Sequence, residues 1–135
     1  MLNFVLGPSG AGKTKWLIDK ANEEVRKGNG NINFIDTDDS HIFSLDHSVR
    51  LTNAKEYGID TLDKLYGFIF GIVSRDYDVE KIYIDGIYSI IEIDSDKLCK
   101  FKKEDHKLEV FMGVNIPKEQ LCEGGQATCV ELKVD

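Results

Sequence analysis

The sequence has no long hydrophobic segment, because its longest nearly uncharged apolar stretch, residues 65–73, is far shorter than the roughly 20 residues needed to cross a bilayer. The first residues also lack the basic segment, apolar run and small-residue cleavage site of a signal peptide. We therefore expect a cytoplasmic protein without membrane insertion. Positive charge is scarce as well: 17 Lys and Arg against 24 Asp and Glu give a net charge of −7. This balance opposes general binding to nucleic acid, so we expect no direct nucleic acid partner.

Cysteine is rare, with only Cys99, Cys122 and Cys129 in the chain. Their odd number and the lack of a CxxC pair argue against a zinc site, and we expect reduced thiols. There is no internal repeat and no low-complexity linker. A length of 135 residues, 41% of them hydrophobic, suits one folded core. We expect residues 1–135 to form a single domain.

Short apolar segments alternate with helical patterns along the chain. The pattern predicts three helices: one from Gly12 to a glycine C-cap at residues 28–30, one capped by Asp60 and running to Val73, and a polar one at 94–106. It predicts a buried strand at residues 2–6, an edge or half-covered strand at 31–35 and a weak strand at 48–52. A central strand at 81–86, a strand at 108–115 and a hairpin-like or edge strand at 128–134 follow. Alternation of strands and helices predicts a small α/β sandwich of three layers with a mostly parallel sheet.

Gly67 and Gly71 are four residues apart in the helix expected to begin near Asp60. They share one helix face, where a neighbouring element could approach closely. We therefore regard this face as one candidate contact for a homo-oligomer or a protein partner.

Residues 7–14 read Gly-Pro-Ser-Gly-Ala-Gly-Lys-Thr and match GxxxxGK[ST] at every fixed position, between a predicted strand and a predicted helix. Glycines let consecutive backbone amides turn inward around a phosphate, and the helix N-terminus adds its positive dipole end. Lys13 could bridge the β- and γ-phosphates, and the hydroxyl of Thr14 could bind Mg²⁺. The candidate phosphate-binding residues are Gly7, Pro8, Ser9, Gly10, Ala11, Gly12, Lys13 and Thr14.

A second acid often helps to hold the magnesium ion of such a loop. Residues 82–84 form an apolar run that ends in Asp85. Because Mg²⁺ keeps several waters and takes few carboxylates, one Asp at the end of a strand opposite Thr14 is a suitable partner. The alternative is a plain aspartate in a turn.

These two motifs resemble the Walker A and Walker B motifs of the P-loop NTPase superfamily. More narrowly, residues 50–51, 66–69 and 83–85 together with the loop resemble small bacterial P-loop proteins often labelled twitching-motility ATPases. The resemblance implies a P-loop NTPase-like fold, a nucleoside triphosphate ligand and Mg²⁺. The acidic and histidine boxes of secretion ATPases are not found, so we expect a nucleotide site rather than a retraction motor.

Many P-loop ATPases carry a glutamate beside the Walker B acid to orient water, whereas here Gly86 follows Asp85. We therefore expect slow hydrolysis. Asn115 resembles the polar sensor on the strand that this class places between the phosphate-loop and Walker B strands, which would bring it near the γ-phosphate. A loop asparagine before residues 116–117 is the alternative.

The acidic loop after the second predicted strand contains Asp36, Asp38, Asp39 and His41. At the carboxyl edge of the sheet these residues could contact Mg²⁺ or act as a base, or they could form a solvated loop.

Three functions remain open. The first is binding of ATP, or GTP, with slow magnesium-dependent hydrolysis. The second is phosphoryl transfer, with Asp36 or Asp38 activating an acceptor hydroxyl. The third is a nonenzymatic, nucleotide-responsive switch or binding module. No NKxD motif selects the nucleobase.

Overall fold

The structure is a computed structural model that describes residues 2–8, 10–28, 31–76, 78–98, 108–122, 126 and 128–133. Its centre is a six-stranded sheet in the order β3-β2-β4-β5-β1-β6, with every strand pairing parallel. The strands are β1 (Leu2–Leu6), β2 (Ile32–Asp36), β3 (Arg50–Asn53), β4 (Lys81–Ile84), β5 (Glu109–Gly113) and β6 (Val130–Glu131). The expected α/β class with a parallel sheet is confirmed.

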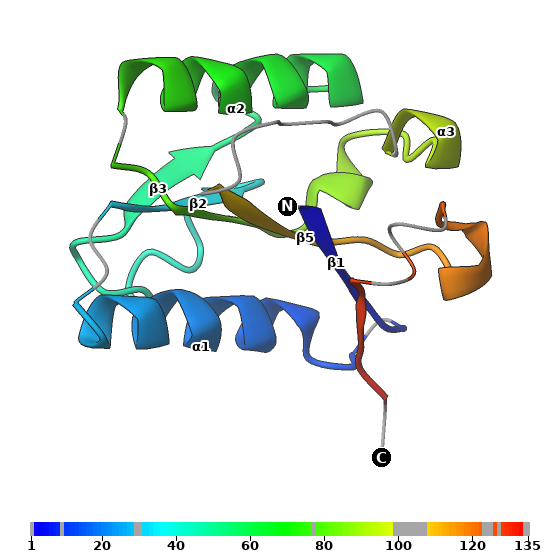
Figure 1. The fold of residues 1–135 in the computed structure, drawn as a ribbon, viewed down its shortest axis with the longest axis horizontal. Coiled ribbons are helices and arrows are strands. Elements are labelled where there is room, and N and C mark those ends of the chain that lie inside the picture. The colour runs from blue at the N-terminus through cyan, green and yellow to red at the C-terminus, as the bar shows by residue number, and fades with distance from the viewer. Residues whose placement is uncertain are drawn as a thin grey trace.

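Helices cover both faces of the sheet and make three layers (Figure 1). α1 (Lys13–Arg26) lies on one face, and α2 (Leu62–Arg75) and the short α3 (Ser95–Leu98) lie on the other. Two 3-10 turns, η1 (Ile87–Ser89) and η2 (Lys118–Gln120), follow β4 and β5. Of the polar helix expected at 94–106, α3 is the described part, and residues 99–107 lie outside the described residues. Within the described ranges, no helix is long and apolar enough to cross a membrane.

The core has two parts because successive strand residues point to opposite faces of the sheet. On the α1 face the buried side chains include Val5, Leu17, Ala21, Phe34 and Tyr83. On the α2 face they include Phe4, Leu65, Ile69, Ile82 and Ile84. The apolar spacing of α1 and α2 therefore gives each helix one buried stripe, which fixes its position over the strands.

The parallel register places the ends of four strands at one edge. β5 lies between β1 and β4, with Val5 opposite Gly113, and β4 lies beside β2, with Ile35 opposite Ile84. The chain leaves these strands at the same edge, where parallel α/β sheets bind ligands. This arrangement brings the loop after β1, the end of β2 and the end of β4 close to one another.

Several local predictions are wrong. β2 is not half-covered: it pairs with both β3 and β4, and all five of its residues are buried, including Asn33. The alternation of polar and apolar residues in β2 indicated one face open to solvent, but the residues on both faces of this strand are buried. The N-cap of α2 is Thr61, whose side chain accepts a hydrogen bond from the Lys64 amide, rather than Asp60. β6 is an edge strand, as one expectation had it, but it pairs in parallel with β1 and does not close a hairpin.

One further expectation is wrong in part, and the partner contact expected at Gly67 and Gly71 stays a prediction. Cys122 is disulfide-bonded, so the expectation of reduced thiols is wrong for this residue, whereas Cys129 is a free cysteine. Cys99 lies outside the described residues. Gly67 and Gly71 are exposed, and a Cβ at either would meet no described atom within 4 Å, so no described element of this chain packs closely against that face.

Candidate functional site

The loop at residues 7–14 joins β1 to α1 and has the backbone that its glycines predict. Gly10 and Gly12 have φ angles of +84° and +92°, in the region that residues with a side chain rarely adopt. Ser9 lies outside the described residues. α1 begins directly after Gly12, whose carbonyl accepts a 2.9 Å hydrogen bond from the amide of Trp16. The loop therefore ends at the N-terminus of a helix of 14 residues.

Gly7 is required by close packing at the start of this loop. Its φ is +155°, and a Cβ there would lie 3.0 Å from both the Ala11 Cβ and the Leu132 carbonyl oxygen. The Ala11 amide donates a 3.0 Å hydrogen bond to the Pro8 carbonyl, which closes the turn. The segment after β6 thus supports the outer side of the loop.

The first turn of α1 leaves backbone donors unused. No described residue accepts a hydrogen bond from the amides of Gly12, Lys13 and Thr14. Such amides, together with the positive end of the helix dipole, favour an anion. The loop therefore has the donor chemistry of an anion site.

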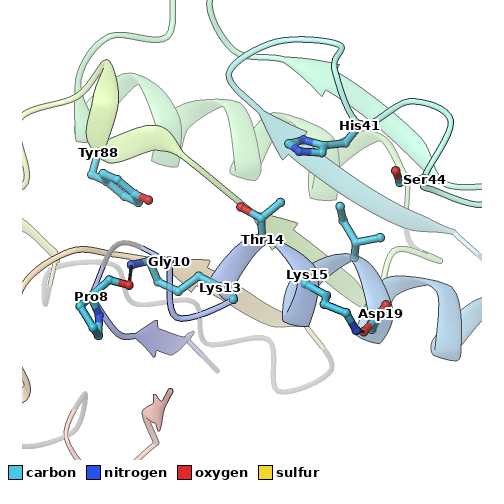
Figure 2. A pocket seen from close by; sticks show the side chains of 11 residues that line it. Pro8, Gly10, Lys13, Thr14, Lys15, Asp19, His41, Ser44 and Tyr88 are labelled. Carbon is cyan, nitrogen blue, oxygen red and sulfur yellow. Dashed lines mark hydrogen bonds and ion pairs between the residues drawn. The ribbon is translucent and has the colours of Figure 1, made fainter. Parts of the chain in front are cut away.

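Lys13 is the buried cation of the site, with 6% of its surface exposed. Its ammonium donates hydrogen bonds to the carbonyl oxygens of Gly7 and, at 3.5 Å, Pro8, and it lies 5.4 Å from the ring centroid of Tyr88. Figure 2 shows the side chain extending back along the loop toward Pro8. Burial lowers the pKa of Lys13, and the charge of Asp85 opposes this change.

Thr14 and Asp85 connect the two sequence motifs. The Thr14 hydroxyl donates a 2.8 Å hydrogen bond to Oδ2 of Asp85, which is 3% exposed. Oδ1 of the same carboxylate is buried and has no hydrogen-bond partner among the described residues. Burial raises the pKa of Asp85, and the hydrogen bond from Thr14 partly offsets this. An unsatisfied carboxylate oxygen beside a hydroxyl is a donor set of the kind that Mg²⁺ binds.

Asp36, at the end of β2, holds His41. Its Oδ1 accepts a 2.8 Å hydrogen bond from the Thr37 amide, and its Oδ2 lies 2.8 Å from Nδ1 of His41. The bond to Asp36 raises the pKa of His41, and burial opposes it. Asp36, His41 and Asp85 each place one polar ligand atom within 4.8 Å of the others. The three side chains come from two adjacent strands and the loop that follows one of them.

Lys13, Thr14 and His41 line a pocket of about 680 Å³, whereas Asp36 and Asp85 are not among its lining residues. One wall is the loop and the first turn of α1, with Lys13 and Thr14, and the facing wall carries His41, Ser44 and Tyr88 (Figure 2). Pockets that bind small molecules have volumes of roughly 300–1,000 Å³. The cavity is therefore large enough for a nucleotide.

The structure does not bring Asn115 into this pocket. β5 does lie between β1 and β4, as expected for a sensor strand, but Asn115 is exposed beyond its end. It lines a separate pocket of about 360 Å³ beside Gly7 and Pro8. Thus Lys13, Thr14 and Asp85 are gathered at one point, whereas Asn115 lies on another side of the loop.

Asp38 and Asp39 match the alternative of a solvated loop, because both are exposed. Oδ1 of Asp38 accepts the Ser40 amide at 2.8 Å, a local turn contact. Tyr88 was missed by the sequence reasoning. Its only signal was an aromatic residue three positions after the acid that ends the Walker B-like run.

In comparisons with known proteins, no protein-family model matches this chain, and no curated protein matches it significantly.

Proposed function

We propose that this protein binds a nucleoside triphosphate together with Mg²⁺ in the pocket between α1 and the ends of β2 and β4. The observation that carries this proposal is the hydrogen bond between Thr14 and Asp85, 2.8 Å long and spanning 71 positions of sequence. It joins the phosphate-loop pattern to the acid that the magnesium role requires. Without this contact the two motifs would be unrelated segments.

The residues of the loop suit a triphosphate. The amides of Gly12, Lys13 and Thr14, which have no described acceptor, and the Lys13 ammonium, which donates to the loop carbonyl of Gly7, would both offer positive charge to phosphate oxygens. Thr14 and Asp85 would hold Mg²⁺, which would neutralise charge on the phosphates. ATP is the proposed nucleotide, with GTP as the alternative, and the cytoplasm is the proposed location.

Slow hydrolysis is the proposed activity. Gly86 follows Asp85 with a φ of +71°, so the position next to the acid has no carboxylate to orient water. Transfer to another acceptor by Asp36 has less support, because both oxygens of that carboxylate already have partners in Thr37 and His41. A binding module that does not hydrolyse the nucleotide is the remaining alternative. Assembly with a second copy or with another protein is a separate proposal.

A thermal-shift panel tests the proposal. The midpoint of unfolding is measured with ATP, GTP, ADP and GDP, each with magnesium and with EDTA. We expect a triphosphate with magnesium to raise the midpoint most, because ligand that binds only the folded state stabilises it by mass action. No shift with any nucleotide would contradict the proposal. A shift without release of phosphate would favour the binding module.

A further inference from the structure

We propose that His41, oriented by Asp36, is the proton acceptor for the water that attacks the γ-phosphate. This inference rests on the proposed function and adds a catalytic residue to the same site. The sequence suggested Asp36 itself as a base, but the geometry points to the imidazole that Asp36 holds.

The carboxylate of Asp36 fixes the orientation of the ring. Asp36 is 2% exposed, and its Oδ1 is held by the Thr37 amide at 2.8 Å. Its Oδ2 lies 2.8 Å from Nδ1 of His41. Because a carboxylate only accepts hydrogen bonds, Nδ1 carries the proton in this pair and Nε2 of the neutral ring carries the lone pair. This is the arrangement that a histidine base needs.

The position of His41 places this base at the pocket. His41 lines the same cavity as Lys13 and Thr14, across from the first turn of α1 (Figure 2). No hydrogen bond links its Nε2 to any described residue, whereas Nδ1 also has the Ser40 hydroxyl at 3.4 Å. Gly86 supplies no carboxylate beside Asp85, and the His41 imidazole at the same pocket offers a base in its place.

The step balances without a further reagent. The oxygen of water forms a bond to the γ-phosphorus, and one of its protons passes to Nε2 of His41. The bond between the γ-phosphorus and the bridging oxygen breaks, and its electron pair leaves on the nucleoside diphosphate. His41 then carries a positive charge beside Asp36, and its side chain, 34% exposed, can release the proton to solvent.

A metal bound by Asp36, His41 and Asp85 together is less consistent with these contacts. Their ligand atoms lie within 4.8 Å of one another, but Asp36 and His41 are already bonded to each other, and Asp36 has Thr37 as its second partner. Of the three side chains, Asp85 has the one buried oxygen, Oδ1, that lacks a partner. The proton-accepting pair is therefore already formed by the contacts of the described residues, and we assign this role to it.

The first test compares His41→Gln with His47→Gln, a control in the same loop whose side chain is fully exposed. Release of γ-labelled phosphate is followed in single turnovers, with the enzyme in excess and its thermal midpoint checked without nucleotide. A positioned base contributes roughly 10²–10⁴-fold, so we expect His41→Gln to slow release at least tenfold. Both variants should bind a non-hydrolysable triphosphate with wild-type affinity, and His47→Gln should keep the wild-type rate.

The second test uses Asp36→Asn. The amide can still accept the Thr37 hydrogen bond, but its NH₂ group then faces Nδ1 of His41 and favours the tautomer that has the proton on Nε2. We expect release to slow, and ¹⁵N spectra of the His41 ring to show the exchanged tautomer. The charges that face His41 are Asp36, Asp38 and Asp85. Because Asp36 raises the pKa of His41, its loss should move the acid limb of the rate profile to lower pH.

The outcomes separate this inference from the proposed function. If the wild type binds no triphosphate, both fail. If it binds one but His41→Gln releases phosphate at the wild-type rate, or if the wild type releases none, the role of His41 is overturned while nucleotide binding stands. A His41→Gln variant that folds but loses nucleotide affinity would also overturn it, since His41 would then be a binding residue.

Discussion

The hydroxyl of Thr14 donates a 2.8 Å hydrogen bond to Asp85 and thereby fastens the first turn of α1 to the end of β4. Thr14 follows the buried Lys13, and Asp85 has a buried oxygen that no group in the described part of the chain pairs with. A cation, a hydroxyl and an incompletely satisfied carboxylate thus meet beside one pocket.

Lys13→Ala should abolish the stabilisation that Mg-ATP gives the wild type. At a nucleotide concentration of 100 times Kd, that stabilisation is about 2.7 kcal/mol. The variant loses the only buried ammonium among the described residues, so the phosphates lose their main counter-charge. Thermal shift relative to the nucleotide-free variant measures the effect, with Lys64→Ala on exposed α2 surface as the control. A full shift in Lys13→Ala would reject the loop assignment.

Asp85→Asn should remove the effect of magnesium on nucleotide affinity while leaving some binding in EDTA. The amide is nearly the same size and can still accept the Thr14 hydroxyl, but it is a poorer ligand for a hard cation. Calorimetric titration of both proteins, with and without magnesium, gives the comparison. Equal magnesium dependence in the two would rule out Asp85 as the metal residue.

The same variant should be more stable than the wild type without magnesium at neutral pH. Burial raises the folded-state pKa of Asp85 above that of the unfolded chain, near 3.9. The folded form therefore binds the proton more tightly, and the cost of ionisation develops as pH rises from about 4 through the raised pKa. We expect Asp85→Asn to have a higher free energy of unfolding than the wild type in denaturant at pH 7, where the wild-type carboxylate carries the cost of ionisation. A gain that is instead largest below pH 4 would contradict this.

Gly67→Ala and Gly71→Ala should each raise the free energy of unfolding by roughly 0.5–1 kcal/mol, because alanine is the better helix former. A Cβ at either position meets no described atom within 4 Å. Denaturant unfolding gives the energies, and light scattering follows the mass. If either substitution destabilises the protein or dissociates an oligomer, the face contacts another molecule rather than solvent.

The strands and helices with strong patterns were predictable from the sequence. β1 is confirmed at Leu2–Leu6, and α1 and α2 lie where their apolar spacing indicated. The apolar pattern of each segment is visible in its own residues, because a helix must bury one stripe and a central strand must bury both faces. β2 was misjudged because its neighbours come from β3 and β4, residues distant in sequence. Polar residues in a strand do not reveal whether another strand covers them.

The candidate site was predictable only in part for the same reason. The loop and Asp85 could be found because their chemistry is local, a glycine pattern and an acid after an apolar run. The hydrogen bond between Asp36 and His41 depends on the conformation of the loop after β2. The contact between the Tyr88 ring and the Lys13 ammonium depends on the position of η1. Asn115 followed a strand in the expected place, yet the turn after β5 directs it elsewhere.

The most direct measurement is an amide NMR titration of the protein with magnesium and a non-hydrolysable ATP analogue. We expect the largest changes at the amides of Gly10, Gly12, Lys13 and Thr14, and we expect Lys13→Ala to remove them. Saturable changes confined to other residues, or none at millimolar nucleotide, would contradict this expectation.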